Sequence, residues 1–499
     1  MYSAYKPMRN FVAKLNRIDS LVKIWSFFGN LERGAPLPQQ FSRIGKHGLA
    51  SLKEVAHPWE LDILTREIIL NAQDDRIKDL YNTDHLSVAI NHIRRISETQ
   101  NADNLEKTLY QELQRLYQQQ SLWRTNTSLM LARHFKIYST PNLASFIERG
   151  TSLSIKQIYT LGISISGHFL TKHVFNTKQD YTAFGISDEQ RDSFIDKIVF
   201  GFDALKHRTA KTQEYNENWS YTINPLISTP LIAFNQAIPN LVICPIPFYL
   251  MYRFSEGLFF DFTSIKGHEQ AYGDAFEQYV HDVSKILNTN QTACRTIEII
   301  KPKPYKIGKN EKHGVDLLIH DATGAALVEC KAKRLNLKAR YQLDDDALYS
   351  EIDILAKFIV QNYKNLEDIV NGHTKWLPSD RTLFPIVVTL VNWNLFAPNV
   401  HERMEESVLK LLDKAGISRD VLHLYPYTVM SVEEYEIAFQ LISQVGVKEF
   451  FSKRANEYQK GWMVMPFIHT NFPKELKACR DDYLNYVLKD LQEELASGI

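Results

Sequence analysis

Apolar residues recur at helical spacing through the first two fifths of the chain, from about residue 9 to residue 210. One stripe consists of Leu105, Leu109, Leu113, Leu116 and Tyr117, and a second contains Ile195, Ile198 and Val199. Apolar positions three and four residues apart are typical of helices that bury one face. We therefore predict a mainly α-helical N-terminal domain over residues 1–220 and expect both stripes to lie in its core.

The pattern changes at residues 221–266, where prolines separate short apolar runs. The prolines are Pro225, Pro230, Pro239, Pro245 and Pro247, and Leu241–Cys244 has the composition of a short strand. This segment is too apolar for a flexible linker. It is predicted to be an ordered, proline-containing connector.

Helical and strand-like segments alternate over residues 267–445. Helices are expected near 267–287, 344–363 and 399–415 and from 432 onward, and strands near 296–301, 385–391 and 421–428, with a hairpin over 314–332. This alternation predicts an α/β domain with a mixed central sheet flanked by helices. Residues 446–499 are predicted to form C-terminal helices, whose apolar stripe includes Leu484, Leu488 and Leu491.

The composition indicates the cellular compartment of the protein, and its overall charge gives no sign of a nucleic-acid partner. The 58 basic residues balance the 58 acidic ones, and the four cysteines are widely spaced without a CxxC pair. Such cysteines indicate thiols in a reducing compartment. No apolar signal-peptide core begins the chain, and the apolar run from Leu241 to Tyr252 is too short to span a bilayer. A cytoplasmic protein without a membrane partner is expected.

The predicted hairpin carries the residues with the clearest chemical potential. Two apolar runs, one after Asp316 and one before Glu329, flank a polar turn that contains Asp321 and Gly324. If the turn is centred between residues 322 and 323, Asp316 and Glu329 lie directly opposite each other, about 5 Å apart at Cβ. Lys331 shares the face of Glu329, because side chains alternate along a strand.

Two facing carboxylates destabilise a hairpin unless a cation lies between them. A hard divalent cation takes oxygen ligands from both acids, and Mg²⁺ keeps several waters while using one or two carboxylates. Lys331 would orient or deprotonate an attacking water and offset developing negative charge. Glu277 lies at the edge of the apolar stripe on the helix expected near 267–287. From that position its side chain could reach the same patch. These are the requirements of phosphodiester hydrolysis.

The order of a helix with FEQY, a strand, a GVD hairpin and an ECK strand resembles the PD-(D/E)xK, or restriction-endonuclease-like, nuclease superfamily. The resemblance covers about 180 residues, although Val315 stands where the family pattern has proline. It implies that Asp316, Glu329 and Glu277 bind the metal together with the backbone carbonyl of Cys330. It also implies that Lys331 activates water and that the cofactor is Mg²⁺, with Mn²⁺ as an alternative.

A local excess of positive charge follows the same strand. Residues 301–340 contain ten Lys or Arg against four acids, a net charge of +6. Such a patch suits phosphate contacts. The expected nucleic-acid-binding residues are Lys333, Arg334, Lys338 and Arg340, followed by Lys357 and Gln361 on the next helix.

The leading hypothesis is a Mg²⁺-dependent endonuclease acting on double-stranded DNA, in bacterial restriction or anti-phage defence by analogy with the family. The helical N-terminal region would bind a regulatory partner protein, and cleavage of both strands would favour a homo-oligomer. Two alternatives stay open. One is a catalytically silent module that binds nucleic acid or protein, and the other is an RNA-directed nuclease or toxin.

Overall fold

The computed structural model describes residues 2–38, 41, 51–102, 105–289, 295–342, 344–377 and 381–497. It is a mixed α/β protein whose chain divides into two compact units, unit 1 from residues 1–266 and 486–499 and unit 2 from residues 267–485. Unit 2 begins at Gly267, the position at which the sequence predicts the start of the α/β domain. Residues 221–266 belong to unit 1, and residues 446–485 belong to unit 2.

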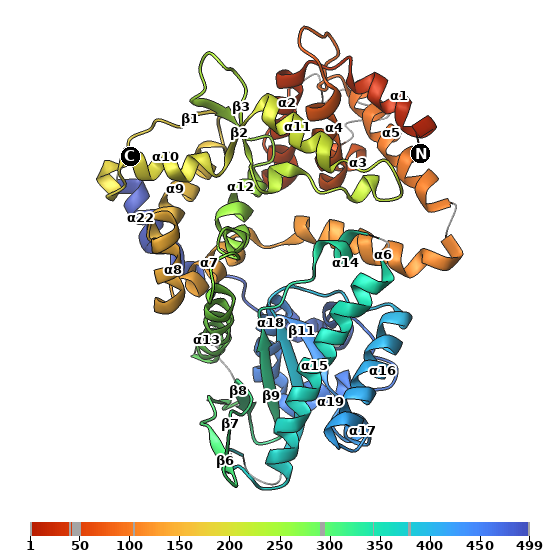
Figure 1. Cartoon of the computed structure of the whole chain (residues 1–499), viewed down its shortest axis with the longest axis vertical. Coiled ribbons are helices and arrows are strands. Elements are labelled where there is room, and N and C mark those ends of the chain that lie inside the picture. The colour runs from red at the N-terminus through yellow and green to blue at the C-terminus, as the bar shows by residue number, and fades with distance from the viewer. Residues whose placement is uncertain are drawn as a thin grey trace. The chain divides into compact units, whose positions relative to one another are not determined.

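Unit 1 is mainly helical (Figure 1). Its helices are α1 (Tyr2–Val12), α2 (Arg17–Arg33), α3 (Leu52–Val55), α4 (Pro58–Asn71), α5 (Thr83–Ala102), α6 (Leu105–Ser121), α7 (Thr127–Tyr138), α8 (Pro141–Thr151), α9 (Ile155–His168), α10 (Asp188–Asp196), α11 (Phe202–Thr212), α12 (Pro247–Phe254) and α22 (Lys489–Ser497). No helix in the described part of the chain is both long and apolar enough to span a bilayer.

Unit 1 also contains a small sheet that the helical periodicity did not predict. Its strands are β1 (Val174–Asn176), β2 (Val199–Gly201), β3 (Leu231–Ala233) and β4 (Leu241–Ile243), in the order β1-β4-β3-β2. The expected strand at Leu241 is thus present. The apolar group at Ile195 and Val199 is divided between the end of α10 and β2, because the helix ends at Asp196.

Unit 2 is built around a five-stranded sheet. Its elements are α13 (His268–Thr289), β5 (Glu298–Ile300), β6 (Tyr305–Ile307), β7 (Asn310–Lys312), β8 (Leu317–His320), β9 (Gly324–Lys331), α14 (Leu337–Tyr341), α15 (Asp345–Val370), β10 (Thr382–Thr389), α16 (Pro398–Ala415), α17 (Val421–Leu424), β11 (Thr428–Ser431), α18 (Val432–Val445), α19 (Val447–Arg454), α20 (Val464–Asn471) and α21 (Pro473–Leu476). The strand order is β11-β10-β9-β8-β5, while β6 and β7 pair separately.

The central sheet is mixed, as the sequence predicted. The pairs β5–β8 and β8–β9 are antiparallel, whereas β9–β10 and β10–β11 are parallel. The expected strand over 421–428 is wrong in its first half, where α17 forms a short helix, and β11 begins only at Thr428.

Helices pack on this sheet through their apolar stripes. Helix α15 packs on β9 and β10 and against α16, and Figure 1 shows it lying across the strands. Its stripe of Ile352, Leu355 and Ile359 is fully buried in one core with Leu327 of β9 and Val387 of β10. Helix α13 packs on β9 and against α18. The sheet is therefore fixed between helices, which gives β8 and β9 a rigid frame.

Candidate metal centre

The β8–β9 hairpin has the register that its sequence predicts. Leu317 pairs with Val328 and His320 with Ala325, so the next position places Asp316 opposite Glu329. Asp321 fixes the turn, because its Oδ1 accepts the backbone N–H groups of Thr323 at 2.7 Å and Gly324 at 3.0 Å. An aspartate that bonds the backbone two and three residues ahead is a common turn device.

Hydrogen bonds hold the three predicted core residues together. The backbone N–H of Cys330 donates to Oδ2 of Asp316 at 2.7 Å, and Nζ of Lys331 donates to Oε1 of Glu329 at 2.6 Å. Side chains alternate along β9, so Glu329 and Lys331 lie on the same face as Leu327, and Cys330 lies on the opposite face. Leu327 is buried against α15. Nζ of Lys331 also lies 5.4 Å from the ring centre of Phe358 on that helix. The two acids and the amine therefore form one patch.

Burial and crowding change how these groups hold protons. Burial, reinforced by the negative charge of Glu329, raises the pKa of Asp316 to about 7. Burial also raises the pKa of Glu329, against the opposing effect of the Lys331 ammonium. For Lys331, burial alone would lower the pKa, but the charges of Glu329 and Asp316 outweigh it and raise the value. The patch thus holds more negative charge than the single ammonium neutralises.

Glu277 lies close to this patch, on α13. Oε1 of Glu277 forms an ion pair with Nζ of Lys301 at 2.9 Å. The negative charge of Glu277 also contributes to the raised pKa of Asp316. The hydrogen bond to Glu277 is the main cause of the raised pKa of Lys301, with a smaller contribution from Asp316. Lys301 was not among the residues that the sequence predicted to lie near the acids. Its position follows from the pairing of Ile300 with Leu318, which no local pattern shows.

The donor set suits a hard divalent cation that is held by few protein ligands. Two facing carboxylates and a neighbouring carbonyl offer only oxygen atoms, which Mg²⁺ and Mn²⁺ prefer. Burial, together with the negative charge of Glu329, raises the pKa of Asp316, and a bound cation would offset both effects. Within the described residues no three His, Cys, Asp or Glu side chains lie close enough to form a ligand cluster by themselves. A metal here would therefore complete its shell with waters and substrate oxygens.

The predicted nucleic-acid-binding residues do not all present free charge. Lys333 forms an ion pair with Glu351 at 3.2 Å, and the guanidinium of Arg334 lies 5.1 Å from the ring centre of Tyr272. Arg340 packs over Tyr341 at 5.2 Å. The exposed members of the set are Lys338 on α14 and Lys357 and Gln361 on α15. The polar face that the sequence placed on α15 is thus accessible, whereas Lys333 and Arg334 serve internal contacts.

Comparison of the chain with protein-family models, with curated proteins and with solved structures finds no match. The geometry of the patch is therefore the basis for any functional inference.

Proposed function

We propose that unit 2 is a divalent-metal-dependent nuclease whose active site is the patch of Asp316, Glu329 and Lys331. The observation that carries this proposal is the convergence of the buried Glu329 carboxylate, the half-buried Asp316 carboxylate and one ammonium at the end of β9. The proposal extends the resemblance to the PD-(D/E)xK nucleases, which rests on the same residues.

Asp316, Glu329 and the carbonyl of Cys330 would hold the cation. When bound, a divalent cation lowers the pKa of a water and stabilises charge on a phosphoryl oxygen. Lys331 lies beside Glu329, where its ammonium would orient the attacking water and offset charge that develops on the phosphate. Glu277 would act at the edge of the site, through the outer ligand or water shell.

Double-stranded DNA is the substrate we infer, and Lys357 and Gln361 are the residues we expect to contact its backbone. Both are exposed on α15, the helix that packs beside Lys331 through Phe358. Contacts of this kind are independent of base sequence and weaken as salt concentration rises.

Cleavage assays test the proposal directly. Purified protein is incubated with plasmid, linear duplex DNA and RNA, with Mg²⁺, Mn²⁺ or EDTA. Cleavage should require the cation and fall by about 10³-fold or more in Glu329→Gln, Asp316→Asn and Lys331→Ala, because each removes a ligand or charge used at the reacting centre. Glu402→Gln and Lys410→Ala, exposed on α16, are matched controls that should retain activity.

The assay also separates the other readings of the patch. Cation-dependent cleavage of RNA alone would reassign the substrate and keep the chemistry. Binding of nucleic acid without cleavage of any substrate, or full activity in all three active-site variants, would contradict the nuclease proposal.

A further inference from the structure

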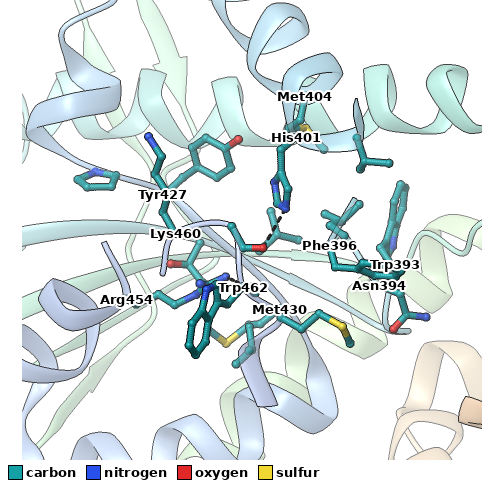
Figure 2. Close-up of a pocket in the computed structure, with 18 of the residues that line it drawn as sticks. Trp393, Asn394, Phe396, His401, Met404, Tyr427, Met430, Arg454, Lys460 and Trp462 are labelled. Atoms are coloured by element: carbon teal, nitrogen blue, oxygen red, sulfur yellow. Dashed lines mark hydrogen bonds between the residues drawn. The ribbon is translucent and has the colours of Figure 1, made fainter. Parts of the chain in front are cut away.

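A cavity of about 500 Å³ beside β11 contains cations that are already engaged in contacts. Figure 2 shows Arg454 and Lys460 in its lining. Buried Arg454 donates to the backbone carbonyls of Gln459 and Trp462, and Nζ of Lys460 lies 3.4 Å from a carboxylate oxygen of Glu457. Both lining cations therefore serve contacts within the wall. Unpaired positive charge lies elsewhere in unit 2, on the hairpin of β6 and β7.

The β6–β7 hairpin is a short basic ribbon, which Figure 1 shows at the margin of unit 2 next to β8. Its strands are joined by a two-residue turn that begins at Gly308, whose φ of +62° is of the kind that such turns require. Residues 302–315 contain four Lys and one Glu, a net charge of +3. Lys303, Lys306 and Lys309 are exposed, and their ammonium groups form no hydrogen bond or ion pair with another described residue.

Contacts at its base fix the hairpin to the end of α15. Nζ of Lys312 lies 2.7 Å from Oδ2 of Asp368, which also accepts a hydrogen bond from the hydroxyl of Tyr305. The ring of Tyr305 packs edge-on against Trp376, with the ring centres 5.1 Å apart. Gly314 lies so close to Trp376 that a Cβ at this position would overlap the indole ring. An isolated two-stranded hairpin is marginally stable, so these contacts hold the ribbon in one orientation.

Both ends of the hairpin segment start from the patch around Asp316. Lys301 precedes the segment and Asp316 follows it. The pairing of Ile300 with Leu318 between β5 and β8 brings these two ends side by side. Lys309, in the turn, is seven residues before Asp316, so an extended chain places it at most about 25 Å away. Phosphates along one DNA strand are about 3.4 Å apart, so this reach covers about seven of them.

We propose that the β6–β7 hairpin binds the backbone of double-stranded DNA beside the bond to be cleaved, with Lys303, Lys306 and Lys309 on its phosphates. The inference rests on the proposed nuclease function, because that function places the cleaved bond at Asp316. The major groove of B-DNA is about 12 Å wide and admits a two-stranded ribbon, whereas the major groove of an RNA duplex is deep and narrow. Lysine contacts to phosphates supply affinity without base specificity.

Binding in EDTA tests the hairpin without cation-dependent cleavage. Fluorescence anisotropy measures the affinity of the full chain for a short labelled DNA duplex at a series of salt concentrations. Lys303→Gln, Lys306→Gln and Lys309→Gln, combined in one variant, should weaken binding about tenfold or more. They should also reduce the slope of log affinity against log salt by about 2.7, because each phosphate contact contributes about 0.9. The same three positions changed to arginine should keep the wild-type affinity and slope, because the charge is retained.

Lys410→Gln, Lys414→Gln and Lys474→Gln, combined in one variant, are the matched control. These lysines are exposed on α16 and α21, and their replacement removes the same net charge. This variant should bind the duplex with the wild-type affinity and slope. An equal loss in the two glutamine variants, or a wild-type slope in the hairpin variant, would overturn the proposal. Tighter binding of an RNA duplex of the same sequence would overturn the choice of DNA.

Failure of the hairpin and failure of the nuclease give different results. Cleavage that requires Mg²⁺ and Glu329, together with an unchanged salt slope in the hairpin variant, would remove the hairpin contact alone. Binding that depends on the hairpin, without cleavage by the wild-type protein, would contradict the nuclease proposal and leave the hairpin as a DNA-binding surface.

Discussion

Asp316 is an acid whose environment differs clearly from that of an exposed carboxyl group. It is held between the backbone of Cys330 and the charge of Glu329, and its pKa rises to about 7. Near neutral pH a substantial fraction of this group is protonated in the absence of a cation. A divalent ion would compete with that proton, so binding of metal and of protons at this patch should be linked.

This proton binding predicts how stability changes with pH in EDTA. The pKa of Asp316 is about 7 in the folded chain and near its ordinary value of 3.8 in the unfolded chain. Between these values the folded state binds more protons, so the free energy of unfolding should fall as pH rises from about 4 to 7. Asp316→Asn should flatten that fall, as measured by urea unfolding at a series of pH values. Exposed Asp274→Asn on α13 should keep the wild-type slope, and an unchanged slope in Asp316→Asn would contradict the assignment.

The sequence predicted that Asp316 and Glu329 face each other because the position of a hairpin turn determines which residues pair across it. Once Asp321 and Gly324 define the turn, alternation fixes which residues face each other, and the register follows. Lys301 escaped prediction because it joins the patch through β5, whose pairing with β8 depends on long-range packing. Nor does charge alone distinguish Lys357, which is exposed, from Lys333, which pairs with Glu351.

At the scale of elements, the leucine stripe of helix α6 was expected to lie in the core, but its described leucines are exposed. Leu109, Leu113 and Leu116 are 43 %, 40 % and 38 % exposed, whereas Glu112 and Arg115 are buried. The prediction that this stripe forms core is wrong for these three residues. Leu105, the first residue of the stripe, has a side chain outside the described set. Periodicity identified the helix but could not say which face is buried, because both faces repeat at the same spacing.

The buried face of α6 is held by polar contacts. Arg115 pairs with Glu112, donates to Oδ1 of Asn218 at 2.8 Å and packs 4.1 Å from the ring centre of Tyr221. Arg115→Leu should therefore lower the free energy of unfolding by about 3 kcal/mol, because it leaves Glu112 as a buried charge without its partner. Leu113→Ala, on the exposed face, should change it by less than about 0.5 kcal/mol. Urea unfolding of the two variants measures both values, and an equal loss would contradict this account of the helix.

At the scale of the whole molecule, the two units carry separate cores. One core gathers residues of α1, α2, α4 and α5 in unit 1, and the other gathers residues of α15, α16 and the central sheet in unit 2. Alternating strand and helix patterns predicted the α/β class of unit 2. The small sheet of unit 1 was not predicted as a sheet, because β1 and β2 have only three residues each and lie among helices.

Separate cores predict separate responses to a cation. Thermal unfolding should show two transitions, and Mg²⁺ should raise the midpoint of the unit 2 transition because ligands stabilise the state that binds them. A concentration one hundred times the dissociation constant would add about 2.7 kcal/mol. Glu329→Gln should abolish the shift, and the unit 1 transition should not move in either protein. Differential scanning calorimetry measures both midpoints, and an equal shift of both transitions, or a shift that persists in Glu329→Gln, would count against the metal centre.

The chain passes from unit 1 to unit 2 near residue 266 and returns near residue 486, where α22 rejoins α9 and Lys156 pairs with Glu494 at 2.7 Å. Unit 2 is thus an insertion with two covalent tethers. A protease that nicks only the first tether would leave a fragment from residue 267 onward that still carries α22, anchored in the other unit. Release of unit 2 requires cleavage of both tethers. After a single cleavage the two fragments should therefore stay together until the protein is denatured.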